Sequence, residues 1–171
     1  MRLGAVVAFA SLLCLPAVLA EEPVVLDGCR TAMFDDLLRM SSHSGTEGEA
    51  AAFIIEDEGQ IRCQMWPAAT GARSSTWKGA VPRGTIAIAH THPDIAHLRM
   101  PSGIDVDLAQ HVGLPLYTIT HAEVWKVDTH GNRTRTKRTE RDRSCGCRQP
   151  RSVLTARAGL GDTVGVIQTA P

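Results

Sequence analysis

The chain has 171 residues, and its 18 Lys and Arg balance its 18 Asp and Glu, so the formal net charge is zero. This balance excludes a strong overall attraction to nucleic acid or to acidic lipid. The length is typical of one domain with a substantial core, and because aromatic residues make up only 4% of the chain, we expect that core to be mostly aliphatic.

The first twenty residues have the three parts of a secretory signal peptide. Arg2 provides a positive start, residues 5–15 form a short apolar run, and Val18-Leu19-Ala20 is typical of a cleavage site. The apolar run is too short for a membrane-spanning helix, although an uncleaved membrane anchor is the alternative. We therefore predict a signal peptide at 1–20 and export to a bacterial periplasm or outside the cell.

Four cysteines follow the predicted signal peptide: Cys29, Cys63, Cys145 and Cys147. An even number of cysteines in an exported chain favours disulfides. Three pairings are open, and the sequence does not choose among them. Because only one glycine separates Cys145 from Cys147, we expect each of these two to reach Cys29 or Cys63. The alternative is a soft-metal site at Cys145-Gly146-Cys147.

The hydrophobic pattern predicts alternating helices and strands along the chain. In chain order these are a helix at 26–40, strands at 49–56 and 60–66, an irregular segment at 67–83, a strand at 85–89, a loop at 93–101, a helix from Ser102 to Gly113, strands at 116–120 and 122–127, a turn at 128–132 and a weak final strand at 160–167. We place the main domain at 21–132.

The composition changes after residue 132. Residues 133–151 hold eight of the 18 Lys and Arg and few apolar residues. We interpret 133–171 as a basic C-terminal extension that is exposed and mobile, tied down at Cys145 or Cys147. The alternative is a binding patch for polyanions.

Two histidines stand two residues apart directly after the apolar strand 85–89. Side chains on an extended segment repeat every second residue, so His90 and His92 point to the same face. Asp105 follows at the start of the predicted helix. Two imidazoles and one carboxylate are the ligand set of a catalytic zinc ion whose fourth position is left for water.

The run His90-Thr91-His92-Pro93, closed by Pro101-Ser102-Gly103-Ile104-Asp105, resembles the JAB/MPN domain family with its JAMM zinc metalloprotease motif. The resemblance covers about residues 26–132. It implies an α/β (α+β) fold with a cytidine-deaminase-like three-layer architecture, a β-sheet flanked by helices in a single domain. It also implies one Zn2+ ion with His90, His92 and Asp105 as metal ligands.

The same resemblance implies a catalytic Glu at the start of the strand after the first helix. Glu49 matches this place, and Glu47 is the second candidate. Zinc lowers the pKa of a bound water to about 7, Glu49 would accept the proton of that water, and Ser102 would donate a hydrogen bond to the developing oxyanion. The alternatives are an exposed carboxylate at Glu49 and a helix capping box at Ser102 and Asp105.

The predicted function is an exported zinc metallopeptidase that hydrolyses peptide or isopeptide bonds. We expect a peptide, isopeptide or cell-wall peptide as substrate, no nucleic acid as partner and no stable membrane span after cleavage of the signal. The alternative is a non-catalytic JAB-type binding or assembly domain in the periplasm. The loop between His92 and Ser102 has nine residues, two more than is usual in the family, and His97 within it is interpreted as a surface residue.

Overall fold

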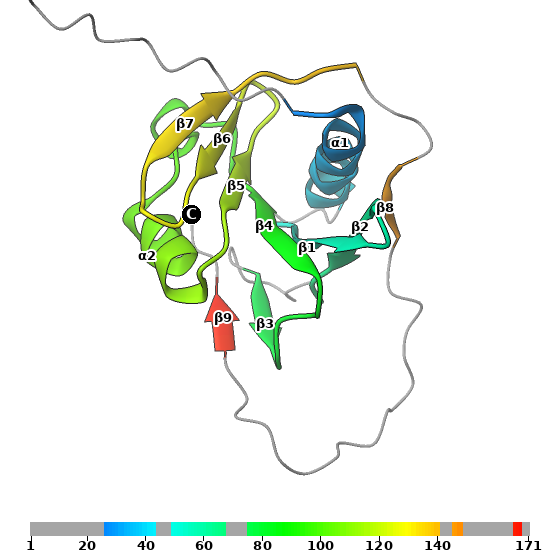
Figure 1. Cartoon of the computed structure of the whole chain (residues 1–171). Helices are drawn as coiled ribbons and strands as arrows, with labels where there is room; N and C mark the ends of the chain where they lie inside the picture. The colour runs from blue at the N-terminus through cyan, green and yellow to red at the C-terminus, as the bar shows by residue number, and fades with distance from the viewer. Residues whose placement is uncertain (1–25, 44–48, 68–74, 141–144, 149–165, 169–171) are drawn as a thin grey trace, which may run out of the picture.

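The computed structural model describes residues 26–43, 49–67, 75–140, 145–148 and 166–168. The predicted signal peptide and Glu47 lie outside these residues. Within them, a seven-stranded sheet has the strand order β7-β6-β5-β4-β1-β2-β8 (Figure 1). The strands are β1 (Ala51–Asp57), β2 (Gln60–Met65), β4 (Thr85–Thr91), β5 (Leu116–Ile119), β6 (Val124–Val127), β7 (Arg133–Thr136) and β8 (Cys147–Arg148). The β4–β5 and β2–β8 pairs are parallel, and the other pairs are antiparallel.

The remaining elements lie outside the large sheet. Helix α1 (Gly28–His43) and helix α2 (Gly103–Val112) flank the sheet on opposite sides (Figure 1). A short 3-10 helix, η1 (Ala96–Leu98), interrupts the loop that leads to α2. Strands β3 (Thr76–Lys78) and β9 (Val166–Gln168) pair with each other to form a separate two-stranded sheet. The described chain is thus a mixed α/β fold with a β-sheet flanked by helices, as the sequence predicts.

Strand β1 shows how the sheet is buried on both faces. Ala52 and Ile54 pack with Phe34 of α1 in one apolar cluster, whereas Phe53 and Ile55 belong to the cluster on the face of α2. These four residues, from Ala52 to Ile55, are each at most 3% exposed. A central strand covered on both faces carries a continuous apolar run rather than an alternating one, which explains the unbroken run in this strand.

Two predicted segments differ from the structure. Residues 133–136 are not a mobile extension but strand β7, which pairs with β6 from Val124↔Thr136 to Val127↔Arg133. The sequence Arg-Thr-Arg-Thr lacks the apolar residues that mark a strand, because β7 lies at the edge of the sheet, where charged residues are common. Strand β3 lies within the segment 67–83, which was predicted to be irregular.

Two disulfides join the C-terminal cysteines to the body of the domain. Cys145 bonds to Cys29 at the start of α1, and Cys147 bonds to Cys63 of β2, with Cα–Cα distances of 5.1 and 5.0 Å. Each C-terminal cysteine therefore reaches one of the two predicted partners, and the soft-metal interpretation of Cys145-Gly146-Cys147 is wrong.

The disulfides also bear on location. Disulfides persist in oxidising compartments, so the two bonds indicate a location outside the cytoplasm. In the described part of the chain, none of the helices combines the length and the apolar character needed to cross a bilayer.

Candidate metal centre

His90 and His92 lie at the end of the central strand β4. His90 stands opposite Ala51 of β1 and Thr118 of β5. The backbone N–H of His92 donates to the Ile119 carbonyl (2.9 Å), which continues the pairing one residue past β4. The two rings pack at 85° with their centroids 4.7 Å apart. The prediction that the two histidines share one face is confirmed.

Asp105 reaches the histidines from the first turn of α2. Ser102 caps this helix: its Oγ accepts the Asp105 N–H (3.3 Å), and Asp105 Oδ2 accepts the Ser102 N–H (2.6 Å). The capping box is therefore present, as the sequence suggests. Asp105 is nevertheless fully buried, which a helix cap alone does not require.

The Asp105 carboxylate bridges the two imidazoles. Oδ1 lies 3.0 Å from His90 Nε2, and Oδ2 lies 3.5 Å from His92 Nε2. Neither contact is aligned as a hydrogen bond. In a tetrahedral zinc site with metal–ligand bonds of about 2.1 Å, neighbouring ligand atoms lie about 3.4 Å apart. The contacts of Asp105 with each of the two histidines, at 3.0 and 3.5 Å, are therefore close to the spacing of neighbouring zinc ligands.

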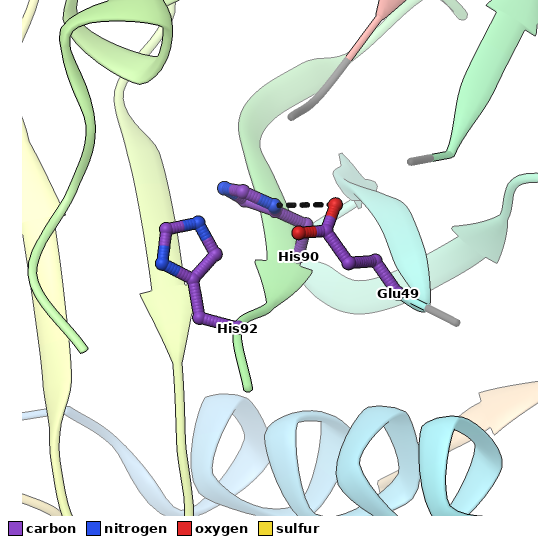
Figure 2. A group of neighbouring side chains, drawn as sticks. All are labelled: Glu49, His90 and His92. Carbon is purple, nitrogen blue, oxygen red and sulfur yellow. Dashed lines mark ion pairs between the residues drawn. The ribbon is translucent and has the colours of Figure 1, made fainter. Parts of the chain in front are cut away.

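Glu49 faces Nδ1 of His90, the ring nitrogen that does not face Asp105, and Figure 2 shows the contact between Glu49 and His90. Its Oε2 lies 3.6 Å from His90 Nδ1, and its side chain is 2% exposed. The backbone on either side of it is fixed, because the Ala50 N–H donates to Thr91 Oγ1 (2.9 Å) and Ser75 Oγ donates to the Glu49 carbonyl (2.7 Å). The alternative that Glu49 is an ordinary exposed carboxylate is wrong.

His92 is oriented by a backbone carbonyl that sequence analysis did not identify. Its Nδ1 lies 2.6 Å from the Leu98 carbonyl oxygen, which can only accept, so Nδ1 must carry the proton. In the neutral ring, Nε2 then presents a lone pair toward Asp105 Oδ2, which is also an acceptor. Within the described residues, this buried Nε2 has no hydrogen-bond partner. A cation placed between the two acceptors would satisfy both, since buried polar atoms rarely lack a partner.

The histidines have opposite pKa shifts. Burial opposes charge on His90, but its contacts with Asp105 and Glu49 more than offset this and raise its pKa to about 9. Burial lowers the pKa of His92, and the neighbouring His90 lowers it further. For Asp105, burial favours the neutral form, but its contacts with His90 outweigh burial and lower its pKa. Without a metal, one proton on His90 supplies the positive charge between the two carboxylates.

Two ligand sets are available to an ion at this place. Glu49, His90 and His92 each offer one ligand atom, all within 4.8 Å of one another, so this buried group could hold a metal ion. His90 faces Asp105 with Nε2 and Glu49 with Nδ1, and one ring cannot turn both nitrogens to the same ion. Coordination through Nε2 therefore selects Asp105 as the third ligand, and coordination through Nδ1 selects Glu49.

The other candidate residues are exposed to solvent. His97 in η1 is exposed, as predicted, and so is Asp107 on α2. His111, His121 and His130, to which no role was assigned, are exposed as well. The loop that contains His97 acts on the site through the carbonyl of Leu98, and no side-chain pattern in the sequence reports such a backbone contact.

No protein-family model matches the chain, and no curated protein matches it significantly. What this site can do is therefore inferred from its residues and their geometry.

Proposed function

We propose that this protein is a zinc-dependent metallopeptidase of the JAMM type, which hydrolyses peptide or isopeptide bonds. The observation that supports it is the buried Asp105 carboxylate, which lies 3.0 and 3.5 Å from two imidazole nitrogens. One of these nitrogens, Nε2 of the neutral His92, is a hydrogen-bond acceptor and faces Asp105 Oδ2, which is also an acceptor. Nitrogen and carboxylate donors are ligands that zinc accepts.

In this proposal His90, His92 and Asp105 would hold the metal through the two Nε2 atoms and the carboxylate. The bound ion would act as a Lewis acid and lower the pKa of a coordinated water to about 7. The Leu98 carbonyl keeps His92 in the tautomer that leaves Nε2 free to bind, because it accepts the proton of Nδ1.

Glu49 is the proposed proton acceptor. Its carboxylate lies in the same buried group as the two histidines, and the hydrogen bonds of Ser75 and Thr91 fix the backbone that carries it. It would take the proton from the attacking water at an Oε atom and deliver it to the leaving amine.

Ser102 is the proposed oxyanion donor. Its Oγ accepts the Asp105 N–H at 3.3 Å, and a hydroxyl that accepts one bond still has its own proton to donate. The helix cap and the stabilisation of a developing oxyanion therefore use different parts of the same hydroxyl group.

The proposed setting is a bacterial periplasm or the outside of the cell, with a peptide, isopeptide or cell-wall peptide as substrate. The two disulfides support a location outside the cytoplasm. The predicted signal peptide would direct the export of the protein from the cytoplasm.

The first test is the metal content of the purified protein. We expect near-stoichiometric zinc in the wild type, loss of zinc in His92→Ala and Asp105→Ala, and retention in His97→Ala, a matched control because His97 is exposed. Retention in all the variants, or no zinc in a folded wild type offered zinc, would contradict the proposed site. If zinc follows the expected pattern, a screen with labelled peptides and isopeptides tests hydrolysis itself.

A further inference from the structure

Strand β3 is anchored directly beside the candidate metal centre. It begins one residue after Ser75, whose hydroxyl donates to the Glu49 carbonyl (2.7 Å). The ring of Trp77 packs against Phe53 and Trp66 of the domain, with centroid distances of 5.0 and 6.3 Å. The strand is thus fixed to the body by side chains, and its backbone is left to pair with another extended chain.

The chain that pairs with β3 comes from the far end of the sequence. β9 pairs antiparallel with β3 in the register Thr76↔Gln168, Trp77↔Ile167 and Lys78↔Val166 (Figure 1). Within the described residues, β3 and β9 have no other strand partner. A two-stranded pair of three residues is marginal by itself in water, so another extended chain can displace β9.

The direction of β9 points to the site. From Val166 to Gln168 the strand passes Lys78 and then Thr76, so it runs toward Ser75 and Glu49. Any peptide that pairs with β3 in the same register runs the same way, and each further residue advances it by about 3.4 Å. Backbone pairing of this kind recognises extended peptides with little regard to their sequence.

We propose that β3 is the docking edge for an extended peptide substrate and that β9 occupies this edge in cis as a self-inhibitory strand. The inhibitory part of this inference rests on the proposed peptidase function: when β9 pairs with β3, a peptide substrate has less access to Glu49. Because β9 belongs to the same chain, its competition with a substrate is intramolecular and does not weaken on dilution of the protein.

The test is binding of a labelled synthetic peptide with the sequence of residues 164–170 to the full-length protein, followed by fluorescence anisotropy. Ile167→Pro removes a backbone N–H and disfavours β9, whereas Ile167→Val keeps the strand and is the matched control. If β9 occupies β3 in about nine of ten molecules, the peptide binds Ile167→Pro about tenfold more tightly than wild type or Ile167→Val. The same peptide with proline at position 167 should bind none of them.

Equal affinity for wild type and a folded Ile167→Pro, or no binding to that variant, would overturn the proposal. Val166→Pro repeats the test at the neighbouring residue. Amide hydrogen exchange of the wild type needs no substitution: excess peptide must increase exchange at 166–168 while 76–78 stay protected, and unchanged exchange at 166–168 would also overturn it.

The peptide-binding result does not depend on catalysis. If the protein binds the peptide as expected but cleaves no peptide at all, the docking edge stands and the proposed peptidase function fails. If both hold, Ile167→Pro should also cleave unstructured peptides faster than wild type.

Discussion

Replacing Glu49 by glutamine tests which carboxylate, Asp105 or Glu49, belongs to the ligand set of the candidate metal centre. Glutamine has nearly the same size and can still accept a hydrogen bond, but it has no charge and cannot take up a proton. Glu49 Oε2 lies 3.6 Å from His90 Nδ1, on the side of the ring opposite to Asp105. If His90 binds the metal through Nε2, Glu49 is not a ligand, and Glu49→Gln should keep its zinc.

The expected effect on catalysis is large. A general base contributes about 10²–10⁴ in rate, and the side chain of Glu49 is only 2% exposed, so solvent cannot readily replace it. We therefore expect kcat on a cleaved peptide to fall by about 10²–10⁴, whereas zinc affinity changes by about 10–100-fold at most, as for the loss of a residue that orients a ligand.

The assay measures zinc by elemental analysis and hydrolysis with the same peptide for four proteins: wild type, Glu49→Gln, Asp105→Asn and Asp107→Asn. Asp107 is an exposed carboxylate on α2 and serves as the control for removal of one negative charge. Loss of zinc in Glu49→Gln together with its retention in Asp105→Asn would refute the reasoning, because Glu49 would then be the ligand and Asp105 the accessory group.

Three further results are expected. Because the pKa of His90 is raised from 6.5 to about 9, the metal-free protein should lose on the order of 3 kcal/mol of unfolding free energy as the pH rises through this window, and urea titrations should show no such loss in His90→Gln. Ser102→Ala should lower stability by about 1 kcal/mol through the lost cap and, with zinc retained, lower kcat by about 10²–10³; Ser102→Gly, which costs only a few tenths in stability, should show the same kinetic loss. Gly146→Ala should destabilise the protein by about 1–3 kcal/mol in urea titrations, because its Cβ would lie 2.7 Å from Asp36 Oδ2, which accepts the Cys147 N–H.

The parts of the site that depend on local sequence patterns could be predicted from the sequence. The shared face of His90 and His92 follows from the two-residue repeat of a strand, and the position of Asp105 follows from the capping pattern that begins at Ser102. Both patterns act over a few residues, so they can be recognised without knowledge of the fold.

The parts that depend on backbone contacts could not be predicted. The Leu98 carbonyl orients His92 across a loop, and Ser75 anchors the carbonyl of Glu49 from 26 residues away. The strand at 133–136 was missed for a related reason, since its stability comes from pairing with β6 rather than from its own apolar residues. At least one partner in each of these contacts is a backbone group that every residue carries, so no residue type reports it.

The Asp105 carboxylate has two roles, because it caps helix α2 and also contacts both histidines of the candidate site. Its Oδ2 accepts the Ser102 N–H that begins α2 and also faces His92 Nε2, while Oδ1 faces His90 Nε2. A carboxylate at a helix N-terminus is normally exposed to solvent, and burying it is costly unless positive charge is near. The proton on His90 supplies that charge in the metal-free protein, and a divalent ion would supply more of it. Metal binding should therefore displace this proton below pH 9 and stabilise α2 at the same time.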